Sequence, residues 1–466
     1  MSAPEQLLVG DVIRNAARRM PRAPAASLGD RQITFEAVAL KAERLAAALY
    51  KVGVRHGDRV AWWAETSLEA VPLYFALAQL GAVFVPLNPR YTEDECRLVL
   101  NKADPRLVLT DDGRGGYARL SDLPDGAGSA PPANVSETDP FILFFTSGTT
   151  GEPKGCILSH RTERLRAGIG SQFPLGATVC MFPQFHMAGW AMALRTWISG
   201  DQMVYVEKPD AHELLKAVSR HRAYDMYCIP AVWQRILETD RSGYDLSSLG
   251  QANTGTSATT PELLAAIGEA VPKAVTWIAY GSTEAHAVCI LGPRDILRKP
   301  NSVGPAAPGV HVKLDEAGEL WVKSPYLFSG YFRNEEATSA ALVDGWYRTG
   351  DLAERDDEGY YSIVGRAKDI IRTGGETVAP VEVDLVLQSH PAVMDGAVRG
   401  TPDERWGEVI EAFVVLRQGS SLTLEALREY CTGRLAPHKH PRRLFIVQAI
   451  PRTGSTGQVQ RRLLVP

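Results

Sequence analysis

The stretch that decides the fold is "FFTSGTTGEPKGCILSH", residues 144–160. It continues an apolar run, residues 141–145, which has the pattern of a strand buried on both faces. The segment after this strand is rich in Gly, Ser and Thr and contains the single lysine Lys154. Backbone N–H groups and hydroxyls with little steric bulk can surround an oxyanion. The stretch therefore predicts an anion-binding loop directly after a buried strand.

The spacing of this loop does not fit a Walker loop. Pro153 precedes Lys154 and Gly155 follows it, so no helix can begin at the lysine as G-x-x-x-x-G-K-[ST] requires. A lone loop of this kind fits an ordinary turn better than a phosphate site. The rest of the chain has to decide between the two.

The residues around the loop predict alternating strands and helices. Apolar residues recur at three- and four-residue steps over 35–50, with Thr34 as the N-cap, which is typical of an amphipathic helix. A strand at 60–63, a helix at 68–80 and a strand at 82–87 come next. Repeats of this kind build parallel sheets covered by helices, an α/β arrangement. The Gly-, Pro-, Asp- and Ser-rich segment 110–139 is interpreted as a surface loop.

Chain length predicts more than one domain, because 466 residues exceed the size at which a single core keeps growing. The composition changes near Gly365, where "GRAKDIIRTGG" leads into a shorter alternating pattern. We therefore expect a large domain of helix-covered sheets at 1–367 and a small α+β domain at 368–466, so that the fold is α/β locally and α+β overall.

Composition excludes several classes of protein. The 50 basic and 54 acidic residues give neither the basic excess typical of nucleic-acid partners nor the acidic excess typical of disorder. The six cysteines show no metal-ligand spacing, so they are interpreted as reduced, buried thiols in a cytoplasmic protein. The sequence contains no apolar run long enough to suggest a secretory signal or a membrane span.

Five blocks in one order carry a family resemblance: "TSGTTGEPKG" (146–155), "YGSTEA" (280–285), "GELWVKSPYLFSGYFRN" (318–334), "DGWYRTGDLA" (344–353) and "GYYSIVGRAKDIIRTGGETVAPVEVD" (359–384). They resemble the signature blocks of the adenylate-forming superfamily, which includes acyl- and aryl-CoA synthetases, peptide-synthetase adenylation domains and firefly luciferase. The likeness runs from about residue 30 to the C-terminus. Several long blocks in order are far more specific than one motif.

The resemblance implies a two-step reaction. In such enzymes a carboxylate attacks the α-phosphate of ATP, forming acyl-AMP and pyrophosphate, and a thiol then displaces AMP. ATP, Mg²⁺ and CoA are the implied cofactors and co-substrate. Charge on the triphosphate has to be neutralised throughout.

The resemblance also implies the nucleotide-binding residues. The first loop would hold the β- and γ-phosphates through Thr146, Ser147, Gly148, Thr149, Thr150 and Lys154. In the block Tyr280, Gly281, Ser282, Thr283 and Glu284, the tyrosine would stack on adenine, Thr283 would contact the α-phosphate and Glu284 would hold Mg²⁺. Asp351 and Arg366 would contact the ribose, and Gly255, Thr256 and Ser257 would form the adenine-side loop. Taken alone, Asp351 and Arg366 fit a surface ion pair, and Tyr280 and Glu284 fit a core aromatic and a solvated acid.

The stretch "FPQFHMAGW" (182–190) resembles the family block P-x-F-H-x-x-G. Its histidine, His186, would line the acyl pocket near the thiol channel as a residue of the catalytic site, with Gly281 beside it. Amino-acid-activating relatives place an aspartate next to this phenylalanine, so His186 favours an acid without an α-amino group. Trp190 is expected to limit the pocket depth. A lone histidine in such a context also fits a satisfied core residue.

The segment after Arg366 resembles the family hinge. Lys368 would lie where the small domain rotates between the two half-reactions, and Gly374 and Gly375 would face the thiol channel. A plain hairpin is the alternative. Seven Lys and Arg residues without Asp or Glu in 433–466 fit either phosphate attraction or a solvated basic tail.

One residue departs from the family pattern. Relatives end with P-R-T-x-(S/T)-G-K-(V/I)-x-R, whose lysine bridges the attacking carboxylate and the α-phosphate. Here the stretch is "PRTGSTGQVQRR" (451–462), with Gln458 in place of the lysine. An amide donates hydrogen bonds but carries no charge. Lys439, which precedes a predicted strand, is not expected to replace it. The chain is then either a lysine-to-glutamine variant that disables or traps a step, or a natural protein with weak adenylation.

These observations predict an ATP-dependent acyl- or aryl-CoA ligase acting on a small-molecule carboxylic acid, with adenylation impaired by Gln458. Two alternatives stay open at this stage. One is a ligase that loads the thiol of a carrier protein. The other is a degenerate protein that binds an acyl-adenylate or nucleotide without turnover.

Overall fold

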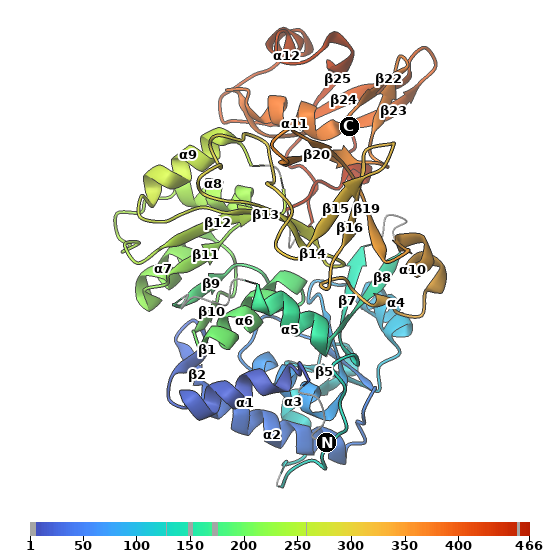
Figure 1. Cartoon of the computed structure of the whole chain (residues 1–466). Helices are drawn as coiled ribbons and strands as arrows, with labels where there is room; N and C mark the ends of the chain where they lie inside the picture. The colour runs from blue at the N-terminus through green and yellow to red at the C-terminus, as the bar shows by residue number, and fades with distance from the viewer. Residues whose placement is uncertain (1–5, 127, 148–151, 170–175, 258, 454–456) are drawn as a thin grey trace.

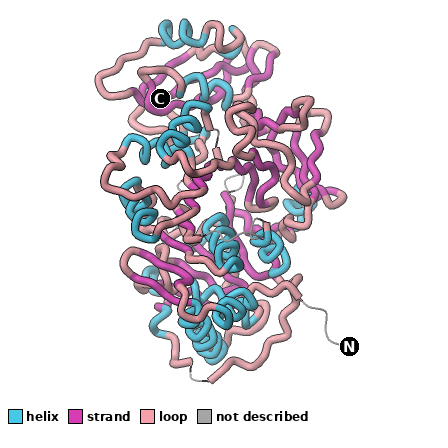
Figure 2. The backbone as a smooth tube through the Cα atoms, turned by 60° about the vertical axis from the view of Figure 1, so that its left-hand side comes forward, coloured by secondary structure: helices cyan, strands magenta, loops and turns pink. Residues whose placement is uncertain are grey.

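The computed structural model of the chain describes residues 6–126, 128–147, 152–169, 176–257, 259–453 and 457–466. Within these ranges, four sheets and their helices form a large N-terminal part and a smaller C-terminal part, which lies at the top of Figure 1. Figure 2 shows the same arrangement after a turn about the vertical axis, with the C-terminal part again at the top. None of the helices in these ranges is long and apolar enough to cross a membrane.

The first sheet has a parallel centre with antiparallel edges, where β14 pairs with β13 and β2 pairs with β1. In spatial order its strands are β14 (His286–Leu291), β13 (Ile278–Ser282), β12 (Gln251–Gly255), β11 (Asp225–Tyr227), β9 (Thr178–Cys180), β10 (Met203–Tyr205), β1 (Pro24–Leu28) and β2 (Arg31–Thr34).

The second sheet contains the predicted buried strand. In spatial order its strands are β17 (Gly330–Tyr331), β8 (Pro153–Ser159), β7 (Pro140–Ser147), β4 (Val83–Leu87), β3 (Arg59–Trp63), β5 (Leu107–Thr110) and β6 (Ala118–Arg119). Strands β4, β3 and β5 are parallel to one another, as expected from alternating strands and helices. Strand β8 runs antiparallel to β7, so the Gly- and Thr-rich loop closes a hairpin.

The helices of the large part cover these sheets. They are α1 (Gly10–Arg19), α2 (Phe35–Lys51), α3 (Ala70–Leu80), α4 (Glu93–Ala103), α5 (His160–Gly168), α6 (Met187–Ser199), α7 (Ala211–His221), α8 (Pro230–Glu238), α9 (Pro261–Ala270) and α10 (Glu335–Ala341). Helix α2 begins where predicted, because the Thr34 hydroxyl accepts a hydrogen bond from the Ala37 N–H at 3.2 Å. Helix α3 begins at Ala70, two residues later than expected.

The core of the large part lies between the second sheet and helix α6. Tyr74 of α3 stacks on Trp190 of α6 with ring centroids 4.3 Å apart, and its ring edge contacts Phe84 of β4 and Phe141 of β7. All but one of the residues of α3 are buried, which explains why this helix is apolar all round rather than on one face. One continuous cluster of buried residues therefore joins both large sheets.

A third sheet extends the large part toward the C-terminal part. Its strands are β15 (His311–Leu314), β16 (Glu319–Lys323), β19 (Trp346–Arg355) and β18 (Leu342–Val343), with β20 (Tyr361–Arg366) paired to β19. The predicted surface loop at 110–139 carries only β6 and two single 3₁₀ turns in its described residues.

The C-terminal part has a sheet and core of its own. Its elements are β21 (Ile371–Thr373), β22 (Glu376–Val378), α11 (Pro380–Gln388), β23 (Val393–Asp403), β24 (Gly407–Leu416), α12 (Leu424–Cys431) and β25 (Arg443–Ile446). Two hydrophobic clusters hold them together, with all buried members from residue 371 onward. The change of sheet between β20 and β21 agrees with a boundary near residue 367, which stays a prediction.

His160 at the start of α5 is a buried neutral imidazole. It is fully buried, its Nδ1 accepts a hydrogen bond from the Val9 N–H at 3.3 Å, and its ring stacks on Phe141. Burial lowers the pKa of His160 from 6.5 to about 4. The folded protein therefore keeps His160 neutral at pH values where the unfolded chain protonates it.

This histidine makes stability depend on pH. Between its unfolded and folded pKa values, 6.5 and about 4, the unfolded chain binds one more proton at His160, so acidification destabilises the fold. We expect His160→Gln to remove roughly 2 kcal/mol of the stability lost between about pH 8 and pH 5. Urea unfolding at both pH values measures this, with His311→Gln on the exposed face of β15 as the control. An equal pH dependence in His160→Gln and in the unmodified chain would contradict the assignment.

Candidate active site

One large cleft gathers residues from distant parts of the sequence. It opens between the first sheet, the β7–β8 hairpin, the third sheet and the C-terminal part. The predicted site residues that line it are Thr146, Lys154, His186, Gly255, Thr256, Ser257, Tyr280, Gly281, Ser282, Thr283, Glu284, Asp351, Arg366, Lys368 and Gln458. Seven segments of the sequence, separated by up to about three hundred residues, therefore meet at one place.

The β7–β8 hairpin brings the phosphate loop to the wall of the cleft. Thr146 and Lys154 are paired across the hairpin, and the Thr146 hydroxyl donates to the Lys154 carbonyl at 3.5 Å. The Lys154 ammonium lies 5.2 Å from the centre of the Tyr331 ring. Ser147 ends β7, whereas its side chain and Gly148, Thr149 and Thr150 lie outside the described residues. The two ends of the loop therefore place its lysine at the cleft.

Glu284 follows β13 and is nearly buried, with 8% of its surface exposed. The Tyr331 hydroxyl donates to its Oε1 at 3.0 Å. Tyr331 lies on β17, which pairs with β8 of the hairpin. Through this tyrosine, the carboxylate predicted to hold Mg²⁺ is tied to the strand that follows the phosphate loop.

Tyr280, Asp351 and Arg366 form one connected group around the buried Asp351 carboxylate. The Tyr280 hydroxyl donates to Asp351 Oδ2 at 2.5 Å, and Arg366 Nε lies 2.6 Å from Asp351 Oδ1. Asp351 on β19 and Arg366 on β20 are directly paired in register. Burial raises the pKa of Asp351, while the Arg366 charge and the Tyr280 hydrogen bond oppose this rise. The Asp351 carboxylate is therefore buried at the wall of the cleft, whereas 39% of the Arg366 side chain is exposed, so the pair differs from the fully solvated surface pair that its residue types alone suggest.

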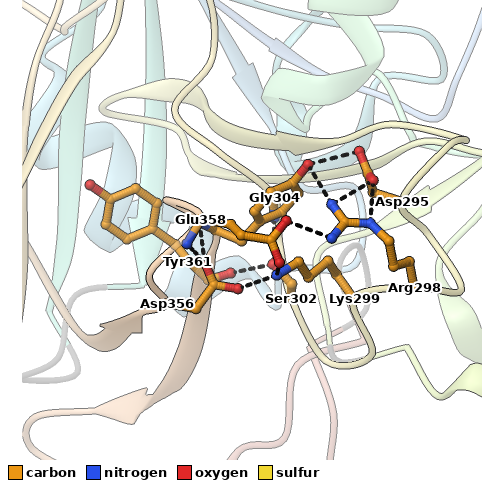
Figure 3. Close-up of polar contacts among 9 residues, drawn as sticks. Asp295, Arg298, Lys299, Ser302, Gly304, Asp356, Glu358 and Tyr361 are labelled. Carbon is orange, nitrogen blue, oxygen red and sulfur yellow. Dashed lines mark hydrogen bonds and ion pairs between the residues drawn. The ribbon is translucent and has the colours of Figure 1, made fainter.

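A surface network fixes the hairpin that carries this group (Figure 3). Asp356 and Glu358 lie in the turn between β19 and β20. Lys299 Nζ lies 2.6 Å from Asp356 Oδ2, and Arg298 Nη1 lies 2.6 Å from Glu358 Oε2. The Ser302 hydroxyl donates to the Tyr361 carbonyl at 2.7 Å. The segment after β14 thus anchors the turn between β19 and β20. These contacts stabilise the two strands that carry Asp351 and Arg366.

The adenine-side loop and Gly281 allow close backbone approach. A Cβ atom at Gly281 would lie 1.8 Å from the His286 carbonyl oxygen, so no side chain fits there. At Gly255 a Cβ atom would lie 2.3 Å from the Tyr227 hydroxyl. Thr256 adopts a left-handed conformation with φ +68°. Neighbouring atoms of the first sheet therefore pack closely against Gly255 and Gly281.

His186 lies on the cleft wall at the start of α6. Its Nδ1 accepts a hydrogen bond from the Ala188 N–H at 3.1 Å, which caps the helix, and its ring stacks on Phe182. Burial lowers the pKa of His186 to about 4, so the imidazole is neutral at pH 7.

The expectation that Trp190 limits the pocket depth is wrong. Trp190 is fully buried, stacks on Tyr74, donates its Nε1–H to the Gln184 carbonyl and does not line the cleft. His186 is the N-cap of α6 and has an extended backbone, so its side chain does not follow the helical direction that carries the Trp190 indole into the core.

The hinge residues lie in two environments. Lys368 is exposed on the cleft, between β20 and β21. Gly374 and Gly375 form the turn of the β21–β22 hairpin with φ +63° and +86°, and the Gly374 N–H donates to the Trp406 carbonyl at 2.8 Å. Neither glycine lines the cleft, so their assignment to a thiol channel stays a prediction.

Gln458 extends from the C-terminal part to the adenine-side loop. Its Nε2 donates to the Thr256 carbonyl at 3.4 Å, from an exposed position on the cleft. Lys439 lies elsewhere, 2.5 Å from Glu382 Oε2, so it does not replace the missing lysine. Other basic residues of 433–466 form ion pairs within the C-terminal part, namely Arg443 with Glu411, Arg452 with Asp395 and Arg461 with Asp384.

Comparison with known proteins agrees with this geometry. Residues 13–332 match the family model described as AMP-binding enzyme, and residues 382–456 match the AMP-binding enzyme C-terminal domain. The chain belongs to the AMP-binding enzymes. The predicted membership of the adenylate-forming superfamily and the mixed α/β fold are thereby confirmed.

Curated relatives of this AMP-binding enzyme are named CoA ligases. The chain is 30% identical to 2-succinylbenzoate–CoA ligase of Listeria monocytogenes, with 97% of this chain and 98% of the relative covered. It is 33% identical to indoleacetate–CoA ligase of Aromatoleum aromaticum, with 95% and 94% covered.

Solved structures show the same fold. The Bacillus subtilis o-succinylbenzoate CoA synthetase in complex with its acyl-adenylate has a TM-score of 0.87 at 26% identity, covering 97% of each chain. The same enzyme with ATP and a magnesium ion has a TM-score of 0.88 at 26% identity, covering 97% of this chain and 98% of that one. The predicted class is confirmed: this AMP-binding enzyme is an AMP-forming acid–thiol ligase that uses ATP, Mg²⁺ and CoA.

The residues of this AMP-binding enzyme fit a magnesium ion whose ligands would come mainly from the ATP phosphates, with one carboxylate from the protein. Glu284 faces the cleft, and only its Oε1 accepts a hydrogen bond from the described side chains. In the described ranges no group of three or more His, Cys, Asp or Glu could hold a metal by itself. Mg²⁺ at nucleotide sites is commonly bound by one or two carboxylates together with phosphates. Glu284 with ATP phosphates matches this donor set.

Sequence reasoning missed two residues of this AMP-binding enzyme. Tyr331 stood in a quoted family block but received no role, although it contacts both Glu284 and Lys154. Arg166 lay outside every block, and its contacts with the carbonyls of Glu284 and Tyr326 are not encoded in local spacing. Arg166 is one of three arginines in helix α5, so its residue type gave no signal that it contacts the site.

Proposed function

We propose that this enzyme activates an aromatic carboxylic acid without an α-amino group as its acyl-adenylate and transfers the acyl group to CoA. A carboxylate oxygen attacks the α-phosphorus of ATP and pyrophosphate leaves. The CoA thiolate then attacks the acyl carbonyl carbon and AMP leaves. The observation that carries the proposal is the meeting of Lys154, Glu284, Asp351, Arg366 and Gln458 around one cleft.

The residues take separate roles in this proposal. Asp351, held by Tyr280 and Arg366, accepts hydrogen bonds from the ribose hydroxyls. Lys154 neutralises the β- and γ-phosphates, and Glu284 holds Mg²⁺ against them. Thr283 contacts the α-phosphate, and Gly255, Thr256 and Ser257 lie beside adenine. Gln458 occupies the position from which a lysine would neutralise the reacting phosphate, so adenylation is slow.

The side chains around His186 support an aromatic acid. The Phe182 ring lies between His186 and Tyr227, with centroids 5.6 Å and 5.4 Å away. Further apolar residues on this wall of the cleft are Phe185, Met187, Met192 and Ile229. Aromatic and thioether side chains pack well against a flat ring. The names of two relatives, which specify 2-succinylbenzoate and indoleacetate, point the same way.

Thioester formation from a panel of acids tests the function. Benzoate, indoleacetate, a short aliphatic acid and an amino acid are each incubated with ATP, Mg²⁺ and CoA, and AMP and thioester are quantified. We expect an aromatic acid to give the highest rate and the amino acid to give none. If a carrier protein but not CoA accepts the acyl group, the proposed acceptor is wrong. If preformed acyl-adenylates and CoA give no thioester, the chain is a binding protein.

The phosphate loop gives a separate prediction. Lys154→Ala is expected to raise the ATP concentration needed for half-maximal AMP formation by roughly tenfold or more, since a charge-assisted contact is lost. The melting temperature should hardly change, because Lys154 is only half-buried at the cleft wall. Lys102→Ala, which removes a lysine paired with Glu152 on the outer side of the hairpin, is the control. An unchanged ATP requirement in Lys154→Ala would show that the loop is merely a turn.

The cytoplasm is the compartment we propose. All six cysteines are free and buried in the structure, as expected of a protein kept in a reducing environment.

A further inference from the structure

Helix α5 contains an arginine that is buried where few charged side chains are. Arg166 lies on α5, which begins directly after β8 of the β7–β8 hairpin, and only 1% of its side chain is exposed. Its Nε and Nη2 donate to the Tyr326 carbonyl at 2.9 and 2.7 Å, and Nη2 also donates to the Glu284 carbonyl at 3.1 Å. A buried guanidinium is costly unless it is paired and hydrogen-bonded, so its contacts identify what it stabilises.

These contacts join three elements of the candidate metal site. The Phe328 N–H donates to the same Glu284 carbonyl at 2.8 Å, so this oxygen accepts two hydrogen bonds. Three residues later, Tyr331 donates to the Glu284 carboxylate and pairs with β8. Arg166 therefore joins the main chain of Glu284 to Tyr326, which begins the short segment whose Phe328 and Tyr331 also contact Glu284.

The hydrogen bonds of Arg166, more than its nearest charged neighbour, indicate its role. Its nearest carboxylate is Glu163, one helical turn earlier and 3.9 Å away, which is also buried. At this distance the two side chains form an ion pair without a hydrogen bond, whereas the guanidinium donates its hydrogen bonds to the carbonyls of Tyr326 and Glu284.

We propose that Arg166 is a positioning residue for the magnesium site, which fixes the main chain of Glu284 and keeps its carboxylate directed at the nucleotide phosphates. This inference rests on the proposed role of Glu284 as the magnesium ligand. Arg166 does not contact the metal in this account. It acts through the Glu284 peptide and through the segment from Tyr326 to Tyr331.

The test measures how Mg²⁺ strengthens ATP binding, which does not require turnover. Calorimetric titrations of ATP at a series of Mg²⁺ concentrations give the concentration of half-maximal effect. We expect Arg166→Met to raise this concentration about tenfold or more, and Arg166→Lys to raise it less, since lysine keeps the charge but loses the fork geometry. AMP affinity without Mg²⁺ should stay within about twofold. Arg164→Lys is the matched control, because Arg164 lies on the same helix and donates to the Leu8 carbonyl instead.

A double-mutant cycle separates this inference from the proposed function. Glu284→Gln should raise the Mg²⁺ requirement, and adding Arg166→Lys to it should cause no further rise, because both changes act on one carboxylate. If Glu284→Gln leaves the Mg²⁺ requirement unchanged, the proposed metal ligand is wrong. If Glu284→Gln raises it and Arg166→Lys does not, or if Arg166→Lys weakens Mg²⁺, ATP and AMP binding equally, Arg166 is only structural. Should Arg166→Met fail to fold, the lysine variant and the cycle decide.

Discussion

Replacing Gln458 with lysine is expected to raise acid-dependent ATP/pyrophosphate exchange by at least about a hundredfold. Removing one preorganised donor from a charged transition state commonly costs about 10²–10³ in rate, and a missing full charge should cost no less. The Gln458 side chain already lies at the cleft, 3.4 Å from the Thr256 carbonyl on the adenine side. A lysine there would bring its ammonium to the reacting carboxylate and α-phosphate.

Two comparisons make this prediction specific. Gln460→Lys adds the same charge two residues away on the same cleft and should leave exchange unchanged within a few-fold. Thioester formation from supplied acyl-AMP and CoA should also change little in Gln458→Lys. This second half-reaction starts from acyl-AMP and does not include the attack on the α-phosphate. Equal exchange rates in the unmodified chain and in Gln458→Lys would show that another group supplies the charge. If neither exchanges with any acid while both bind ATP, the chain is a nucleotide-binding protein.

Asp351→Asn is expected to weaken the binding of ATP and AMP together, by roughly 10- to 100-fold, the range for hydrogen bonds to a charged group. The asparagine keeps the shape but removes the charge that Arg366 and the ribose hydroxyls share. Both nucleotides should be affected equally, since both carry the same ribose. Glu354→Gln, an exposed substitution on the same strand β19, should change neither affinity.

The same variant should also lose stability. Arg366 would lose its carboxylate partner, but the loss should be at most about 1 kcal/mol, because 39% of the Arg366 side chain is exposed and water replaces part of the lost contact. Calorimetric titration with AMP and urea unfolding measure the two effects. Full nucleotide affinity in Asp351→Asn would remove Asp351 from the site, even if the protein were less stable.

Local patterns in the sequence were sufficient for most elements and for the family. The helix at 35–51 and the strands at 59–63, 83–87 and 140–147 follow from apolar periodicity and a Thr34 cap, which are properties of chain neighbours. The blocks that carry the family resemblance are also contiguous stretches. They name Lys154, Glu284, Asp351 and Arg366 without any knowledge of how these residues meet.

Tertiary structure decided where the side chains of those elements point. The helix α6 that carries His186 to the cleft turns Trp190 into the core against Tyr74, a choice made by α3 more than a hundred residues away. Neither Tyr331 nor Arg166 could be assigned, because their partner Glu284 lies in another block.

The ion pair of Asp351 with Arg366 shows the physical reason. Residue types alone fit a solvated pair at the surface, and burial of the Asp351 carboxylate beside Tyr280 turns the same pair into a candidate ribose site. Short-range periodicity determines which segments become helices and strands, since it depends on residues a few positions apart. Burial, pairing and the direction of a side chain depend on contacts between distant segments, and only the packed chain supplies them.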